Sequence, residues 1–267
     1  MPEDFPPRRL WRLAKRRASY WRLQRRLAGR RLLHAFAAAH PDAFFVEIGA
    51  NDGDHHDHLR PFILSGQWRG IMVEPVPYVF TRLKANYGHL GRIQLANVAI
   101  ADRDGQLPFY HPAEVADPEA EQVPGWYHGL GSFSRETVLR HAEHIPDIED
   151  RIVSQDVACL TFESLCERYG ADRVDLLVID TEGYDWEILR NIDFSQQRPR
   201  LIAYEHYHLS AEERADCREH LEALGYETLE EGFDTFCLDT RVADALTDEW
   251  RALEPALPPL SAEEKAG

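Results

Sequence analysis

The sequence predicts an α/β protein built on a mainly parallel sheet. From residue 44 onward, short apolar runs alternate with amphipathic stretches, which is the pattern of successive β–α–β units. Residues 174–180 are nearly continuously apolar, as expected for a strand that is buried on both faces of a parallel sheet. The 267 residues suffice for a sizeable core, and no internal repeat is visible. One large domain with an N-terminal helical arm fits best.

The expected elements follow in order along the chain. Strands are predicted at 44–48, 70–74, 93–100, 105–110, 174–180 and 200–205, with a closing pair at 226–229 and 235–238. Helices are predicted at 79–87, 135–142, 162–169, 184–190 and 211–224, from apolar residues at helical spacing and from terminating glycines. Residues 111–130 are rich in Pro, Gly and acids, so we expect a loop or lid there.

A basic segment precedes an acidic body. Residues 1–40 carry eleven basic and two acidic side chains, a net +9, whereas residues 41–267 carry a net −25, which gives the total of −16. No Pro occurs from 8 to 40 and the apolar residues favour one side, which predicts a helix. The helix either packs on its own acidic body or contacts an anionic membrane surface. The predicted division is an arm at 1–40, a main α/β domain at 41–245 and a tail at 246–267.

Composition excludes several classes of protein. No apolar run approaches the roughly 20 residues of a membrane-spanning helix, and the first 40 residues lack a signal-peptide core. Four dispersed cysteines suggest neither a disulfide framework nor a zinc module, which favours a cytoplasmic protein, with peripheral contact to the inner membrane face as an option. An acidic body repels phosphate backbones, so a nucleic acid is not expected as a partner.

The first candidate site is the glycine turn after the first strand. Glu47, Gly49, Asn51 and Gly53 lie in the segment FVEIGANDG, and Glu74 ends the second strand 21 residues after Gly53. Glycines allow close backbone approach to a ligand, and a carboxylate at the position of Glu74 can accept both hydroxyl hydrogens of a ribose. The turn is not the three-glycine cradle that binds a pyrophosphate, and it contains acids. Acids suit a ligand with an amino group and a sulfonium charge, namely S-adenosylmethionine.

The second candidate site combines two further strand ends. Asp180 and Glu182 follow the strongest strand, and Glu205 and His206 follow its predicted neighbour. Open α/β sheets bind ligands at this edge, and clustered carboxylates have perturbed pKa values that suit general base chemistry. His206 is the preferred base for removing a hydroxyl proton because histidine titrates near neutrality, with Glu205 or Glu182 as competitors. A divalent ion held by Asp180, Glu182 and Glu205 is chemically reasonable, but no metal is predicted.

These segments together resemble the FkbM family of S-adenosylmethionine-dependent methyltransferases. The resemblance covers roughly residues 40 to 240, and its most specific piece is VDLLVIDTEGYDWEILRNID at 174–193. The other matching segments are FVEIGANDG (45–53), IMVEP (71–75), NVAI with the downstream glycine (97–105), RPRLIAYEH (198–206) and GFDTFCLD (232–239). The resemblance implies a Rossmann-like, doubly wound, seven-stranded sheet with an antiparallel strand near one edge.

The resemblance also implies residue roles and an activity. Glu47, Gly49, Asn51 and Gly53 would line the methionine part of the cofactor, Glu74 the ribose, Asn97 and Val98 the adenine, and Asp180 the amino end. The implied reaction is methyl transfer to a hydroxyl of a sugar, glycan or secondary metabolite. Two alternatives are an NAD-dependent oxidoreductase, because Glu74 also suits that ribose, and a non-enzymatic membrane-surface or docking protein with a degenerate cofactor fold.

Three segments receive no role from these patterns. The insertion at 111–157 is long. His55, His56 and His58 are better explained as a solvated helix start capped by Asp54 than as a metal cluster. The segment GLGSFS at 129–134 either closes over the ligands or is a plain loop before the next helix.

Overall fold

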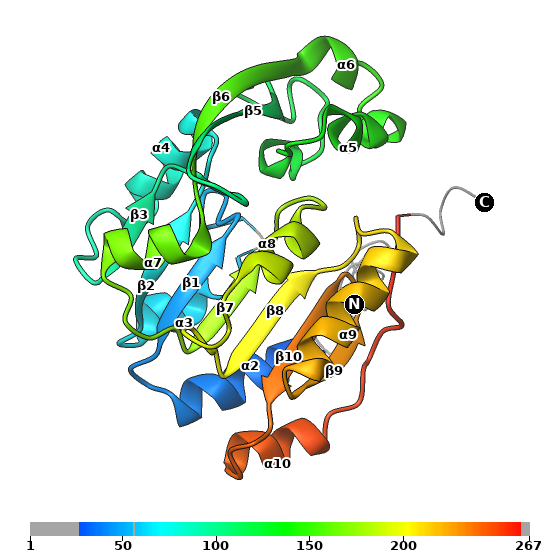
Figure 1. The fold of residues 1–267 in the computed structure, drawn as a ribbon. Coiled ribbons are helices and arrows are strands. Elements are labelled where there is room, and N and C mark those ends of the chain that lie inside the picture. Colours follow the sequence, from blue (N-terminus) through cyan, green and yellow to red (C-terminus); the bar gives the residue numbers. More distant parts are fainter. Residues whose placement is uncertain (1–26, 56, 263–267) are drawn as a thin grey trace, which may run out of the picture.

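A seven-stranded sheet forms the middle layer of the protein. The computed structural model describes residues 27–55 and 57–262, and its sheet has the strand order β3-β2-β1-β7-β8-β10-β9 (Figure 1). All neighbours pair in parallel except β10, which is antiparallel to both β8 and β9. The strands are β1 (Phe44–Ile48), β2 (Arg69–Val73), β3 (Ile93–Ala96), β7 (Leu176–Ile179), β8 (Leu201–Glu205), β9 (Tyr226–Glu231) and β10 (Asp234–Asp239). The doubly wound, Rossmann-like prediction is confirmed.

Helices cover both faces of this sheet because the strands carry apolar side chains on both sides. One face buries Val46, Leu177 and Ile202 against α7 (Phe162–Tyr169), α8 (Asp185–Asn191) and α9 (Ala211–Ala223). The other face buries Phe45, Met72 and Leu201 against four helices. These are α2 (Ala28–Ala39), α3 (Arg60–Ser65), α4 (Pro77–Tyr87) and α10 (Ala245–Arg251).

Helix α2 belongs to this core. Its residues Leu32 and Phe36 are fully buried, and the Gly29 amide donates to Glu231 Oε2 over 3.1 Å. The last third of the basic arm therefore packs on the body of the same chain. Residues 1–26, on which the membrane prediction depends, lie outside the described residues. Among the residues that are described, no helix has both the length and the apolar character to cross a bilayer.

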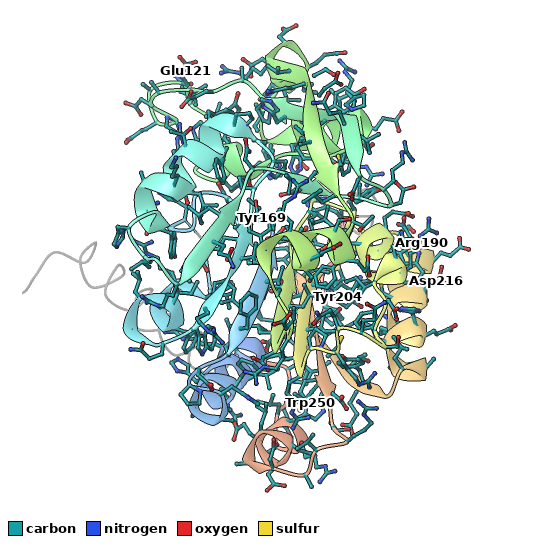
Figure 2. The ribbon with its side chains drawn as sticks, turned by 60° about the vertical axis from the view of Figure 1, so that its left-hand side comes forward. Glu121, Tyr169, Arg190, Tyr204, Asp216 and Trp250 are labelled. Carbon is teal, nitrogen blue, oxygen red and sulfur yellow. The ribbon has the colours of Figure 1, made fainter. Side chains whose placement is uncertain are left out.

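Residues 99–160 form a cap over the carboxyl ends of the strands (Figure 1). Its frame is a three-stranded sheet, β4-β6-β5, of β4 (Ala99–Ile100), β5 (Gly105–Pro112) and β6 (Ile152–Leu160). Short helices complete it: η1 (Tyr127–Gly129), α5 (Arg135–Leu139), η2 (Arg140–Glu143) and α6 (Ile148–Arg151). Tyr127, Val138 and Ile148 form a separate small core. Figure 2 shows Glu121 at the outer end of the cap and Trp250 at the opposite end of the molecule.

The structure corrects three sequence expectations. The strand expected at 93–100 breaks because the Asn97 side-chain amide donates to the carbonyl oxygens of Glu74 and Pro75, over 2.8 and 3.0 Å. Strand β6 was not expected, since its middle residues are exposed and polar. Helix α10 begins at Ala245, one residue before the predicted tail, where the Asp244 side chain accepts from the Thr247 amide, and it packs Trp250 of that tail into the core.

Candidate functional site

The register of the parallel strands aligns the candidate acids in one row. Ile48 is paired with Val73 on one side and with Ile179 on the other, and Ile179 is paired with Tyr204. The next residue of each strand therefore lies at the same edge of the sheet. These next residues are Gly49, Glu74, Asp180 and Glu205. On the antiparallel neighbour, Asp234 is paired with Glu205 and extends the row.

A cavity of about 1030 Å³ lies between this row and the cap. Ligand sites commonly occupy about 300–1,000 Å³, so the space can hold two ligands side by side. From the body it is lined by Gly49, Asn51, Glu74, Val98, Asp180, Glu182, Glu205, Tyr207, His208, Phe233 and Asp234. From the cap it is lined by Phe109, Trp126, Gly129, Leu130, Gly131, Phe133, Arg140, His141, Glu143 and His144.

The glycine turn brings the backbone of β1 against that of β7. Gly49 has a φ of +85°, and a Cβ at this position would overlap the Asp180 carbonyl oxygen. Asn51 is also left-handed, with a φ of 49°, and its amide donates to Glu74 Oε2 over 3.1 Å. The turn therefore follows the row of strand ends closely and is joined to Glu74.

Glu74 is buried at the β2 end of this row. Its second oxygen accepts from the Val76 amide over 2.7 Å. Burial raises the pKa of Glu74 to about 7, although both backbone hydrogen bonds oppose the shift. Near neutral pH this carboxyl is therefore close to its own pKa and responds to any ligand that favours the charged form.

Three more carboxyls line the cavity further along the row, those of Asp180, Glu205 and Asp234. The side chain of Asp180 is accessible from the open space, whereas Glu205 and Asp234 are half-buried. Because the enclosing protein limits hydration and neighbouring acids repel, the pKa values of Asp180 and Glu205 lie well above the ordinary range. The same loss of hydration raises the pKa of Asp234 to about 7. Acids that repel one another are stabilised by a cation, so the cavity is electrostatically suited to a positively charged ligand.

Glu182 has the opposite electrostatic setting. Its Oε2 lies 2.9 Å from His208 Nε2 and 3.7 Å from Nε2 of His141, a residue of the cap. Burial alone would raise its pKa, but the two imidazoles lower the pKa of Glu182 to about 2. Glu182 holds a left-handed φ of 53°, which for a residue with a side chain is backbone strain of the kind found at functional sites.

The segment at 129–134 lies against the site. A Cβ on Gly129 would lie 3.0 Å from Asn51 Nδ2, and the Ser132 hydroxyl donates to the Glu182 carbonyl oxygen over 3.4 Å. This segment therefore contacts the glycine turn and Glu182, and it leads directly into α5, whose N-cap is Ser134.

Four of the sequence-predicted residues do not line the cavity. Glu47 is buried beside Asp57, and burial followed by the charges of Asp57 and Asp180 raises its pKa well above the ordinary range. Gly53 packs on the ring of Tyr87, and its carbonyl accepts the Tyr87 hydroxyl hydrogen over 2.7 Å. Asn97 instead stabilises the end of β2, because its side-chain amide donates to the carbonyl oxygens of Glu74 and Pro75.

His206, the preferred base, is the fourth residue and the main correction. It is fully buried outside the cavity. Its Nδ1 lies 2.8 Å from the Thr235 hydroxyl oxygen, and its Nε2 lies 3.1 Å from the Gly232 carbonyl oxygen. Burial lowers its pKa to about 4. A neutral imidazole with both nitrogens occupied cannot take a proton from a substrate in the cavity.

Three residues of the cavity were not predicted from the sequence: His208, His141 and Asp234. His208 stands two residues after His206 in YEHYH, and β8 ends at Glu205, so strand alternation no longer fixes which histidine faces the site. Asp234 lies inside the segment GFDTFCLD and could have been found as a further strand-end acid. No sequence motif surrounds His141, and only the fold of the cap brings its side chain to the site.

The histidine-rich segment does not start a helix at Asp54. Helix α3 begins at Arg60, and the Asp57 side chain accepts from the amides of Leu59 and Arg60 over 2.6 and 3.0 Å. His55 Nδ1 lies 2.7 Å from Asp52 Oδ2. His58 lines the cavity, and His56 lies outside the described residues.

Comparison with known proteins identifies the family. The methyltransferase FkbM domain matches residues 47–234, which is most of the chain. The chain belongs to the FkbM methyltransferase family. The match spans every residue of the row of strand ends and the whole cap, so it includes every residue that lines the cavity except Ala262.

Individual relatives are more distant. The 2-O-methyltransferase NoeI of Sinorhizobium fredii is 28% identical over 166 residues, covering 62% of this chain and 64% of that protein's length. Among solved structures, methyltransferase FkbM from Methylobacillus flagellatus KT has a TM-score of 0.47 and 13% identity, over 74% of this chain and 44% of that chain. A putative RNA methyltransferase from Pyrococcus horikoshii has a TM-score of 0.41 and 11% identity, over 79% of each chain.

Proposed function

We propose that this FkbM-family protein transfers a methyl group from S-adenosylmethionine to a hydroxyl of a sugar or another small hydroxylated molecule. The observation that carries the proposal is the row of carboxyls, Glu74, Asp180, Glu205 and Asp234, inside one cavity. The FkbM domain supports methyl transfer. The name of the relative, a 2-O-methyltransferase, supports oxygen as the acceptor atom.

The half of the cavity around β1 and β2 fits the donor. Glu74 offers a buried carboxyl to a ribose, the Gly49–Asn51 turn lets the backbone approach a ligand, and Val98 offers an apolar surface to adenine. Asp180 can pair with an ammonium group. When bound, S-adenosylmethionine supplies a methyl carbon made electrophilic by an adjacent sulfonium. A pyrophosphate would meet the carboxyls of Glu74, Asp180, Glu205 and Asp234 along this row, which disfavours the NAD-dependent alternative.

The other half of the cavity suits a hydroxylated acceptor. Tyr207 and Phe233 form an edge-to-face ring pair with centroids 4.8 Å apart at its wall, and Trp126 lines it from the cap. Aromatic rings with nearby hydrogen-bonding groups are the usual composition of a ligand pocket. This lining, with Arg140 beside it, supports a small polar acceptor.

Glu205 is the group best suited to remove the acceptor proton. It lines the cavity, and its Oε2 is buried with no hydrogen-bond partner among the described residues. Burial and neighbouring acids raise its pKa, which makes it a stronger base than an ordinary carboxylate. Glu182 is the weaker base, because its pKa is lowered to about 2.

We further propose a cytoplasmic location, since all four cysteines are free and buried. Peripheral membrane contact through residues 1–26 remains a prediction from the sequence alone.

Calorimetric titration of the full chain with S-adenosylmethionine, S-adenosylhomocysteine and NAD tests the donor. We expect binding of the first two and none of NAD. Incubation with methyl-labelled donor and a panel of glycans, lipids and small polyols, followed by mass analysis, then tests the acceptor. Tight binding of NAD without any response to the sulfonium ligand would remove the proposal.

A further inference from the structure

Three potential metal ligands converge in the acceptor half of the cavity. They are His141 from η2 of the cap, Glu182 from the turn after β7, and His208 after β8. One donor atom of each lies within 4.8 Å of the other two. The three residues come from separate parts of the chain, so their convergence is a property of the fold and not of local sequence.

The separations fit a shared ion. Glu182 Oε2 lies 2.9 Å from His208 Nε2 and 3.7 Å from His141 Nε2. Metal bonds of about 2.1 Å at tetrahedral or octahedral angles place neighbouring donor atoms about 3.0–3.4 Å apart. Small side-chain rotations would therefore bring all three donors to one centre.

The three donor side chains are largely shielded from solvent, and some of their polar atoms have no hydrogen-bond partner among the described residues. The His208 side chain is 7% exposed, that of His141 15% and that of Glu182 20%. His141 Nε2 is buried without a hydrogen-bond partner among the described residues, and so is Oε2 of the adjacent Glu205. Buried polar atoms without partners are uncommon in native proteins, and a cation in this part of the cavity would pair with both of these atoms.

We propose that His141, Glu182 and His208 bind one divalent first-row transition-metal ion, which joins the cap to the body of the protein beside the acceptor. Two imidazoles and one carboxylate suit Zn²⁺, Mn²⁺, Fe²⁺ or Co²⁺ better than Mg²⁺ or Ca²⁺, which prefer oxygen ligands. The site shares only Glu182 with the all-carboxylate set considered from the sequence. Three protein ligands leave coordination positions open to substrate.

The position of the ion gives it a role in the proposed methyl transfer. A hydroxyl oxygen bound at an open position becomes more acidic, and its proton passes to Glu205 as the oxygen–carbon bond forms and the carbon–sulfur bond breaks. The products are the methyl ether and S-adenosylhomocysteine. This role rests on the proposed function, whereas binding of the ion does not.

The test uses Co²⁺ as a spectroscopic probe on the full, tag-free chain after treatment with a chelator. We expect one equivalent to bind with visible d–d absorption, to be displaced by Zn²⁺, and to be unaffected by Mg²⁺. His141→Ala, Glu182→Gln and His208→Ala should each weaken binding at least tenfold. Loss of an outer-shell partner typically lowers metal affinity about 10–100-fold, and loss of a ligand itself should lower it at least as much. Thermal unfolding provides a second measurement, because the ion should raise the melting temperature of the wild type and not of the variants.

His220→Ala is the matched control. His220 lies on α9 outside the cavity, and its Nε2 is buried without a hydrogen-bond partner among the described residues, as that of His141 is. It is not one of the three donors, so this variant should bind Co²⁺ as the wild type does. The comparison separates loss of a ligand from loss of any buried imidazole.

Two results would overturn the proposal: no Co²⁺ binding to the wild type, or binding that persists unchanged in all three variants. S-adenosylhomocysteine titrated into the metal-free protein separates this failure from that of the proposed function. If that ligand binds while Co²⁺ does not, the metal site is wrong and the donor site stands.

Discussion

Position 49 has no room for a side chain, so only glycine fits there. A Cβ there would overlap the carbonyl oxygen of Asp180, and φ is +85°. A left-handed conformation costs a residue with a side chain about 1–2 kcal/mol, and overpacking adds about 1–3 kcal/mol. We expect Gly49→Ala to lower the free energy of unfolding by about 3 kcal/mol, measured by denaturant titration.

The control for this prediction is Gly91→Ala. No atom lies within 4 Å of a Cβ at Gly91, and its φ is not positive, so the change should stay within about 0.5 kcal/mol. Equal effects at both glycines would show that the close approach at Gly49 is not what limits that position.

Glu74 makes stability depend on pH in an identifiable direction. Burial raises its pKa from 4.5 to about 7, so the folded protein binds this proton more tightly than the unfolded chain does. The stabilisation is complete below pH 4.5 and is lost as the pH rises through 7. At about 1.4 kcal/mol per pKa unit, the whole change is about 3 kcal/mol.

Comparison with Glu74→Gln isolates this effect. In the absence of ligand, the free energy of unfolding of the wild type should fall by about 2.5 kcal/mol relative to that of the variant between about pH 5 and about pH 8. This is less than the whole change because part of it occurs below about pH 5. Denaturant unfolding of both proteins at the two pH values measures the difference. A constant difference across this range would mean that Glu74 keeps an ordinary pKa.

Glu205 should matter for turnover more than for binding. Removal of a general base typically lowers kcat by about 10²–10⁴-fold. We therefore expect Glu205→Gln to lose that much activity on the acceptor found in the panel while it still binds S-adenosylhomocysteine. His206→Gln should instead lose stability and keep kcat within a few-fold, because its ring bonds to Thr235 and Gly232 away from the cavity. The reverse pattern would restore His206 as the base.

Individual acids could be predicted from the sequence because each follows an apolar strand of clear pattern. Glu74, Asp180 and Glu205 lie in one row for that reason. The roles of His206 and His208 could not be predicted from the sequence, because the orientation of each ring depends on the turn after β8. It also depends on distant partners such as Thr235, which is 29 residues away from His206.

At the scale of elements, the cap is separable from the sheet. None of its residues from 113 to 151 belongs to the two cores that cover the faces of the sheet. The Ala113 amide donates to the Arg151 carbonyl oxygen over 2.8 Å, next to the pairing of Pro112 with Ile152. The two ends of this segment therefore lie side by side, as the ends of two strands joined by a hairpin turn do.

This arrangement predicts the outcome of an excision. Replacement of residues 114–150 by Asn-Gly, a two-residue hairpin turn, should leave a protein that unfolds cooperatively in denaturant. Methyl transfer should be lost, because the cap supplies part of the cavity lining. A molten or insoluble product would mean that the cap contributes to the folding of the sheet.

The elements themselves were mostly predictable where hydrophobic periodicity was strong. Helix α7 has the expected bounds, 162–169. Strand β6 was missed because a half-exposed strand with polar residues at 154–156 has no apolar run, and the break at Asn97 depends on a side-chain bond to another strand.

At the scale of the whole molecule, charge should influence how the donor binds. The chain carries −16, and the cavity concentrates acids. The Debye length falls from about 30 Å at 0.01 M salt to about 3 Å at 1 M, so attraction of a cation weakens across that range. We expect salt to reduce the affinity for S-adenosylmethionine more than that for S-adenosylhomocysteine, which lacks the sulfonium charge, as measured by calorimetry. Equal salt dependence would exclude this contribution.

The topology of the whole sheet was predicted only through the family resemblance. The apolar runs indicate strands, but they do not say that β10 inserts between β8 and β9. Nor do they indicate that residues far apart, His141 and His208, share one cavity.

The hydrogen bond that joins Ala113 to Arg151 also bears on how such a protein can diversify. Insertions or deletions between these two residues change the chain length without pulling on the strands that carry the acids. Under the proposed function, changes confined to this one segment can therefore alter the acceptor side of the cavity while the strand ends proposed to bind the donor stay as they are.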